Sequence, residues 1–78
     1  MSEFKIEIVY QGWAEPVTVR LPGADHKTAE TLLAVINDGV AKARAEGGRQ
    51  AHIVNFVSGQ DLTVQAGRFE SARLVELA

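Results

Sequence analysis

A chain of 78 residues is too short to hold two independent hydrophobic cores, and the absence of cysteine excludes disulfide bonds and thiolate zinc sites. Its 46% hydrophobic and 23% charged residues are typical of a folded globular protein, and a net charge of −2 removes the simple electrostatic argument for nucleic-acid binding. We therefore expect residues 1–78 to form a single domain, to which oligomerisation would add stability.

The first residues, MSEFKIEIVY, lack the basic segment and the long apolar run of a signal peptide. The longest apolar runs in the chain are only a few residues long, far short of a membrane span. We therefore expect a cytoplasmic protein that does not enter a membrane.

Two strands are predicted at the start of the chain. Apolar side chains occupy every second position from Phe4 to Tyr10, which is the period of a strand with one buried face. After a turn over residues 12–16, the same alternation runs from Val17 to Leu21. We expect this second strand to return beside the first as a hairpin.

A long amphipathic helix should follow. Asp25 can accept backbone hydrogen bonds as its N-cap, and Gly47-Gly48 suits its C-terminal end, so we expect a helix from about His26 to Glu46. Its expected buried stripe is Ala29, Leu33, Ile36, Val40 and Ala43, widened by Leu32. Gly39 lies inside the helix, where it marks either a close approach to another element or, as the simpler interpretation, a tolerated cost.

The rest of the chain predicts three further strands, at His52 to Val57, Leu62 to Ala66 and Arg73 to Leu77, with a turn or a short helical turn over residues 67–71. The element order is then ββαβββ. This order predicts an α+β fold of two layers, with the single long helix packed on one face of a mainly antiparallel sheet.

The third strand is apolar on both faces, although a single helix can cover only one. A two-residue loop at Gly59-Gln60 would pair Asn55 with Val64 and Ile53 with Ala66 on the face beneath the helix. Val54 and Phe56 would then lie on the opposite face, against Gln65 and Thr63. A three-residue loop would invert the faces and expose Ile53 and Val57 instead.

Either register leaves an apolar pair on the face without the helix, and Val9 with one of Leu74 or Val75 can add to it. A modest apolar patch among polar side chains is typical of an interaction surface. Trp13, in the turn after the first strand, is either a second contact residue or folds back over the sheet edge. The predicted partner-binding residues are therefore Trp13, Val54, Phe56, Thr63 and Gln65.

We find no pattern that supports catalysis, and no catalytic, metal-binding or cofactor-binding residue is predicted. Ser58 and Asp61 lie near His52 in the sequence, but turn formation explains both of them. Asp25-His26 is the one adjacent pair of metal-ligand type, and helix capping accounts for Asp25.

Anion binding finds little support in the sequence. Gly47-Gly48-Arg49 follows the helix, where the negative end of the helix dipole would repel a phosphate, so we interpret it as a helix terminator. Basic residues of the second half could gather near the helix C-terminus and the turn after the fourth strand, but Glu46, Glu70 and Glu76 are interleaved with them, as on a solvated face. These basic residues are Lys42, Arg44, Arg49, Arg68 and Arg73.

The function we expect is a non-enzymatic protein–protein interaction or adaptor module that is homodimeric, and its size suits a bacterial or phage accessory protein. Two alternatives remain open. One is a nucleic-acid-binding module that uses the Lys and Arg residues of the second half. The other is a small-ligand binder or enzyme with a cleft near His52.

Overall fold

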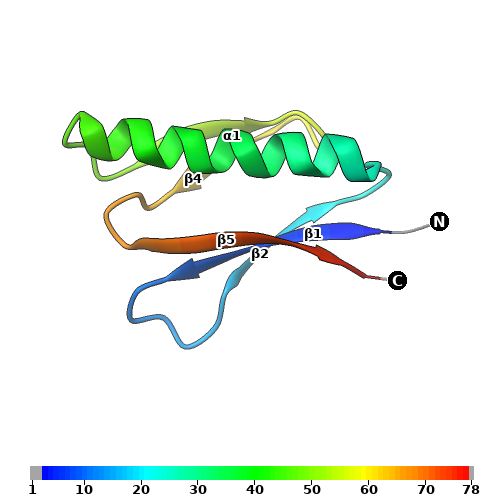
Figure 1. The fold of residues 1–78 in the computed structure, drawn as a ribbon, viewed down its shortest axis with the longest axis horizontal. Helices are drawn as coiled ribbons and strands as arrows, with labels where there is room; N and C mark the ends of the chain where they lie inside the picture. Colours follow the sequence, from blue (N-terminus) through cyan, green and yellow to red (C-terminus); the bar gives the residue numbers. More distant parts are fainter. Residues whose placement is uncertain (1–2, 78) are drawn as a thin grey trace.

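One helix and two antiparallel sheets make up the computed structural model, which describes residues 3–77 (Figure 1). The predicted α+β class and the order ββαβββ are confirmed. The helix α1 spans His26–Ala45, and it contacts strands of both sheets. The strands are β1 (Phe4–Tyr10), β2 (Val17–Leu21), β3 (Ala51–Asn55), β4 (Gln60–Val64) and β5 (Phe69–Glu76).

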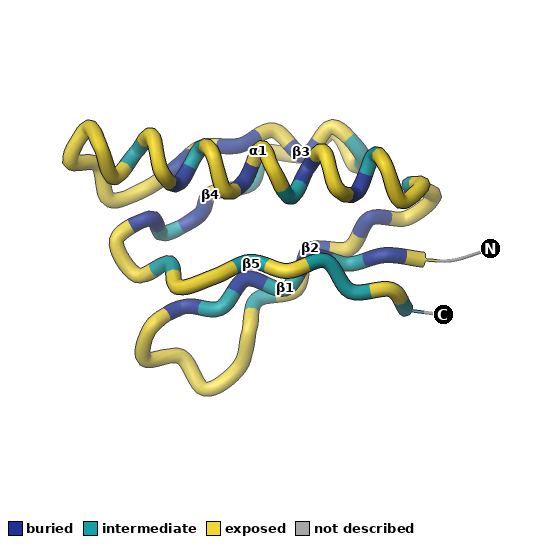
Figure 2. Tube along the Cα trace, in the orientation of Figure 1, coloured by how far each residue is buried: buried dark blue, intermediate teal, exposed yellow. Residues whose placement is uncertain are grey.

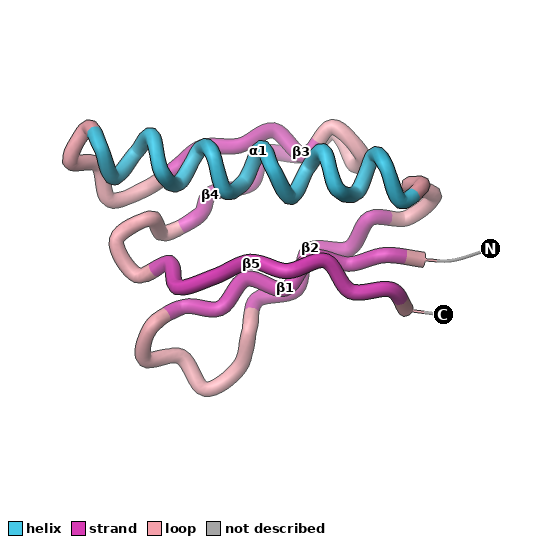
Figure 3. The backbone as a smooth tube through the Cα atoms, in the orientation of Figure 1, coloured by secondary structure: helices cyan, strands magenta, loops and turns pink. Residues whose placement is uncertain are grey.

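The five strands divide into two sheets where the sequence predicted one. β1 is the centre of a three-stranded sheet in the order β2-β1-β5, and β3 and β4 form a separate hairpin (Figure 3). Both edges of β1 are occupied, because β2 and β5 each pair with it in antiparallel register. A turn after β4 at residues 66–68 then carries the chain out of the hairpin and into the other sheet.

Both ends of α1 are fixed by the residues that the sequence indicated. At the start, the Asp25 side chain accepts a hydrogen bond from the backbone N–H of Thr28 at 2.7 Å. At the end, Gly47 has a φ of +74° and donates to the carbonyl of Arg44, and Gly48 donates to the carbonyl of Ala43. This pair of bonds is a Schellman motif, which ends the helix by satisfying its last carbonyls.

The core lies where α1, the β3–β4 hairpin and the inner face of the three-stranded sheet meet (Figure 2). Leu32 is fully buried at the centre of the helix stripe, whereas Leu33 and Ala43 are only half-buried at its margin. The buried apolar residues are Phe4, Ile6, Ile8, Tyr10, Val19, Leu21, Ala29, Leu32, Ile36, Val40, Ala51, Ile53, Val64 and Ala66.

The last strand begins earlier than the sequence predicted. β5 starts at Phe69 instead of Arg73, and its pairing with β1 shifts register between Val9 and Tyr10. This irregularity allows both Phe69 and Ala72 to pack against the core despite their odd spacing. Of residues 67–71, which the sequence predicts as a turn or a short helical turn, only 67 and 68 belong to the turn after β4, and residues 69–71 belong to β5 at its register shift.

The connections gather at two ends of the molecule (Figure 1). The β1–β2, α1–β3 and β4–β5 connections lie at one end. The β2–α1 and β3–β4 connections lie at the other, together with the start of β1 and the end of β5. These two ends carry different candidate sites.

Candidate functional site

The outer face of the β3–β4 hairpin carries the most exposed large apolar side chains of the described residues. Val54 is 59% exposed and Phe56 is 48% exposed, whereas Ile53 and Asn55 face the core. Thr63 lies on the same outer face, opposite His52, and its hydroxyl stands 3.5 Å from Nδ1 of that histidine. Exposure of the Val54 and Phe56 pair agrees with the first of the two predicted arrangements.

The hairpin register differs from both predicted ones. Asn55 pairs with Gln60 and Ile53 with Leu62, so the turn has four residues, Phe56 to Gly59. Relative to the two-residue loop the pairing is shifted by an even number of positions, so every side chain keeps its predicted face. Val54 consequently stands opposite Asp61, and not opposite Gln65 as predicted.

Asn55 explains the longer turn. Its Oδ1 accepts hydrogen bonds from the backbone N–H groups of Val57 at 3.0 Å and Ser58 at 3.3 Å. Its carbonyl accepts from the N–H of Gly59 at 2.7 Å, and Gly59 has a φ of +76°. A side chain that binds the backbone within the turn outweighs the local preference for a two-residue loop. The same bonds hold Phe56 at the outer corner of the hairpin.

Trp13 and Gln65 lie at the other end of the hairpin from Phe56. The ring of Trp13 packs against Tyr10, with centroids 5.0 Å apart, and is 44% exposed. The hydroxyl of Tyr10 accepts a hydrogen bond from the N–H of Gln65, just beyond β4. The five predicted contact residues therefore do not form one patch: Val54, Phe56 and Thr63 lie on the outer hairpin face, with Trp13 and Gln65 beyond its open end.

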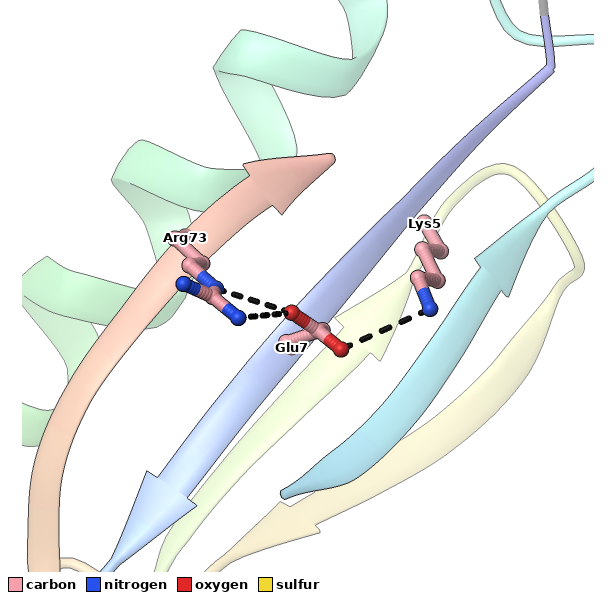
Figure 4. A network of polar contacts seen from close by, with 3 residues as sticks. All are labelled: Lys5, Glu7 and Arg73. Atoms are coloured by element: carbon pink, nitrogen blue, oxygen red, sulfur yellow. Dashed lines mark hydrogen bonds and ion pairs between the residues drawn. The ribbon is translucent and has the colours of Figure 1, made fainter. Parts of the chain in front are cut away.

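The outer face of the three-stranded sheet is a second, more polar surface. Val9 and Val75 lie half-buried on this surface. They do not extend the apolar patch of Val54 and Phe56, because the strands divide into two sheets. Glu7 binds Arg73 through its Oε1, at 2.8 Å from Nε and 2.6 Å from Nη2, and its Oε2 lies 3.4 Å from Lys5 Nζ (Figure 4). The Arg73 hydrogen bonds and the neighbouring positive charges lower the pKa of Glu7 from its ordinary value.

Three of the five basic residues of the second half, Arg44, Arg49 and Arg68, lie near the C-terminal end of α1 and the β4–β5 turn, whereas Arg73 lies on the outer face of the three-stranded sheet. Arg73 is paired with Glu7, and Arg44 is used to join α1 to the β4–β5 turn. Nε of Arg44 donates to the carbonyl of Ala66 at 2.8 Å, its Nη2 donates to the carbonyl of Phe69, and its guanidinium lies over the Phe69 ring. Arg49 and Arg68, by contrast, line the same pocket.

The two histidines have local partners. Nδ1 of His26 lies 2.7 Å from Glu30 Oε1, one helical turn away, and the His26 ring meets the edge of Phe4. His52 is exposed and lies at the open end of the hairpin, whereas Ser58 belongs to the turn at the far end of β3. The structure therefore does not bring Ser58 to His52.

The described part of the chain offers no cluster of metal-ligand side chains. Among residues 3–77, no three His, Asp or Glu side chains come together as a group that could hold a metal ion. α1, the one helix in that range, is not apolar enough to cross a membrane. Comparison with protein-family models, curated proteins and solved structures gave no significant match to this chain.

Proposed function

We propose that this chain is a non-enzymatic protein–protein interaction module that forms a homodimer through the outer face of the β3–β4 hairpin. The observation that carries the proposal is the exposure of Val54 and Phe56, at 59% and 48%, near each other on one strand and its turn. Other exposed large apolar residues, Trp13 and Val35, stand apart from this pair on a loop and on the helix. Aromatic and aliphatic side chains ringed by polar ones are typical of interface centres.

The hairpin also offers free backbone groups. Among residues 3–77, β3 and β4 pair only with each other, so each strand keeps one edge without a strand neighbour. An unpaired edge presents N–H and C=O groups that a strand of another chain can satisfy. A second copy of this chain is the partner we favour, since twofold dimers are the commonest assemblies and a two-stranded sheet gains stability from added strands.

The polar neighbours of Val54 fit a rim around such a contact. Asp61 stands directly opposite Val54, and the His52–Thr63 pair lies two positions further along on the same face, so polar side chains adjoin the apolar one. A cytoplasmic location is also part of the proposal. A chain without cysteine needs no oxidative folding, and it is therefore compatible with a reducing compartment.

The test is the mass of the protein in solution. Light scattering behind a sizing column, over a range of protein concentrations, should give twice the chain mass for the wild type. Phe56→Asp should weaken dimerisation by more than about 2 kcal/mol if Phe56 is a central anchor, while circular dichroism shows an unchanged fold. A wild type that stays monomeric at high concentration would remove the dimer from the proposal.

Val35→Asp is the matched control. Val35 is 39% exposed on α1, so the same charge is added to another exposed apolar position away from the hairpin. It should leave the dimer intact. Equal weakening by Val35→Asp and Phe56→Asp would show that added negative charge, and not the hairpin face, governs association. Trp13→Ala tests whether the contact extends to the open end of the hairpin.

A further inference from the structure

A pocket of about 410 Å³ opens where the α1–β3 connection meets the β4–β5 turn. Its lining residues are Arg49, Gln50, Gln65, Gly67 and Arg68. The side chains of the four residues other than Gly67 all carry N–H donors, and none carries a carboxylate. The pocket therefore has the donor set of an anion site, in a chain whose net charge is −2.

Backbone hydrogen bonds fix the walls of this pocket. The N–H of Gly67 donates to the carbonyl of Arg49 at 3.3 Å, which joins the two connections directly. The turn itself is closed by the bond from Arg68 N–H to the Gln65 carbonyl at 3.1 Å. The carbonyl of Arg68 accepts from Gln11 at 2.8 Å. The backbone that carries both arginines is therefore in place before any ligand arrives, which lowers the entropy cost of binding.

Arg49 and Arg68 also differ from Arg44 and Arg73 in the partners of their side chains. Within residues 3–77, neither Arg49 nor Arg68 forms an ion pair or a side-chain hydrogen bond, whereas Arg44 and Arg73 have the structural partners described above. Each guanidinium offers five N–H donors and no acceptor. Two such groups on one pocket repel each other unless an anion lies between them.

The C-terminal end of α1 repels an anion in this pocket less than the sequence suggested. The carbonyls of Lys42, Ala43 and Arg44 each accept a backbone hydrogen bond, from Glu46, Gly48 and Gly47 respectively. The negative charge of a helix end resides on carbonyls that lack such partners. The Schellman motif therefore weakens the repulsion that favoured a helix terminator over a phosphate site at Gly47-Gly48-Arg49.

We propose that the pocket binds a phosphate-type oxyanion between the guanidiniums of Arg49 and Arg68, with the amides of Gln50 and Gln65 as neutral donors. A tetrahedral oxyanion can accept from all four side chains, whereas a carboxylate has only two oxygens to offer them. A phosphorylated small molecule and a nucleic-acid backbone both present this group. The proposal is independent of dimer formation through the hairpin.

The experiment titrates inorganic phosphate and pyrophosphate into the ¹⁵N-labelled protein, at ionic strength held constant with sodium chloride. Saturable shifts should appear at the amides of Arg49, Gln50, Gly67 and Arg68. Trp13, the single tryptophan, gives a second readout through its fluorescence, because its ring packs on Tyr10 and the Tyr10 hydroxyl binds Gln65. Shifts that grow without saturation, or that sodium chloride alone produces equally, would overturn the proposal.

Three variants assign the binding to this pocket. Arg49→Gln and Arg68→Gln should each raise the dissociation constant about tenfold or more, since each removes a charge-assisted hydrogen bond. Arg20→Gln makes the same charge change on β2, outside the pocket, and should leave binding within about twofold of the wild type. Equal losses in all three variants would show that only net charge matters and would overturn the site.

A single-stranded oligonucleotide titrated in parallel identifies the source of the oxyanion. Tighter binding than pyrophosphate, with a steep loss of affinity as salt is added and the same dependence on Arg49 and Arg68, assigns the site to a nucleic-acid backbone. Saturable pyrophosphate binding without oligonucleotide binding assigns it to a phosphorylated small molecule. Failure of both probes to bind overturns the proposal.

Discussion

Gly39 of α1 lies so close to Ile53 of β3 that a Cβ on the glycine would stand 3.2 Å from Ile53 Cδ1 and 3.3 Å from Cγ1. This contact brings the helix and the hairpin together. The simpler interpretation from sequence, that Gly39 is a tolerated cost, is therefore replaced by the alternative of a close approach. A glycine inside a helix costs about 1 kcal/mol relative to alanine, and the packing against Ile53 offsets that cost.

Gly39→Ala should change the free energy of unfolding by less than about 1 kcal/mol, because displacement of Ile53 offsets the gain in helix propensity. Ile53→Val removes Cδ1, the nearer of the two contacting atoms. In that background Gly39→Ala should become stabilising, with a coupling of about 0.5–1 kcal/mol between the two substitutions. Urea unfolding of the wild type, both single variants and the double variant measures this coupling.

Gly39→Leu provides the complementary test, since its side chain has no room between α1 and β3. It should lower the free energy of unfolding by about 1–3 kcal/mol through overpacking. Additive effects of Gly39→Ala and Ile53→Val, together with a harmless Gly39→Leu, would mean that the helix and hairpin do not touch at this point.

The elements of the fold could be predicted from local signals, but their assembly could not. Alternation alone located β1, and the pair Asp25 and Gly47 located both ends of α1 because capping is a local interaction. The division into two sheets depends on which strand occupies the second edge of β1. That choice is made by β5, a distant segment, and no local pattern in the sequence encodes it.

The candidate sites show the same limit. Exposure of Val54 and Phe56 could be predicted although the register was wrong, because only the parity of the pairing decides which face a strand residue occupies. A gathering of basic residues near this end of α1 was one possibility, but the meeting of Arg49 and Arg68 in one pocket could not be predicted, since it depends on how the α1–β3 and β4–β5 connections pack. The signal that was available, two arginines each beside a glycine, is common in solvent-exposed turns.

Ile36 and its neighbour Val35 test the orientation of the helix. Ile36 is fully buried, whereas Val35 is 39% exposed outside the buried stripe of α1. Ile36→Ala should lower the free energy of unfolding by about 2–5 kcal/mol, because it removes buried methylene groups and leaves a cavity. Val35→Ala should change it by less than about 0.5 kcal/mol. Similar melting temperatures for the two variants would place the buried stripe elsewhere.

Arg44 should stabilise the β4–β5 turn through the two carbonyls that it binds, those of Ala66 and Phe69. Arg44→Met keeps the aliphatic stem but removes both guanidinium hydrogen bonds, and the Ala66 carbonyl retains only the 3.4 Å bond from the Phe69 N–H, so the free energy of unfolding should fall by about 1–3 kcal/mol. Arg44→Lys should recover only part of the loss, since one ammonium group cannot reproduce a planar guanidinium. Urea unfolding, with Lys42→Met as the control for loss of a nearby charge, checks both. Full recovery by lysine would contradict this role.

Glu7 should make the stability of the protein depend on pH. Its hydrogen bonds from Arg73, and the charges of Arg73 and Lys5, lower its folded-state pKa below the ordinary value of 4.5. The folded protein therefore binds fewer protons at Glu7 than the unfolded chain does, so this stabilisation is complete above pH 4.5 and is lost as the pH falls through the folded-state pKa. The free energy of unfolding of the wild type should therefore exceed that of Glu7→Gln by less as the pH falls.

Unfolding by urea at a series of pH values from neutral down to the acid range measures this difference. In an Arg73→Gln background, adding the Glu7→Gln substitution should change the free energy of unfolding only slightly at every pH, because the main partner of the carboxylate is gone. A wild-type advantage that is the same at neutral and acidic pH would show that Glu7 contributes through packing and not through its charge.

Asn55 should determine the shape of the hairpin turn that presents Phe56. It is 6% exposed, and its Oδ1 accepts from two backbone N–H groups, those of Val57 and Ser58. Asn55→Ala removes both acceptor contacts within a largely buried site and should lower the free energy of unfolding by about 1–3 kcal/mol. Asn37→Ala is the matched control: Asn37 is exposed within α1, where alanine is the better helix former, so that variant should be neutral or slightly more stable. If both substitutions have the same effect in urea, the side chain of Asn55 does not hold the turn, and the position of Phe56 on the outer face has another cause.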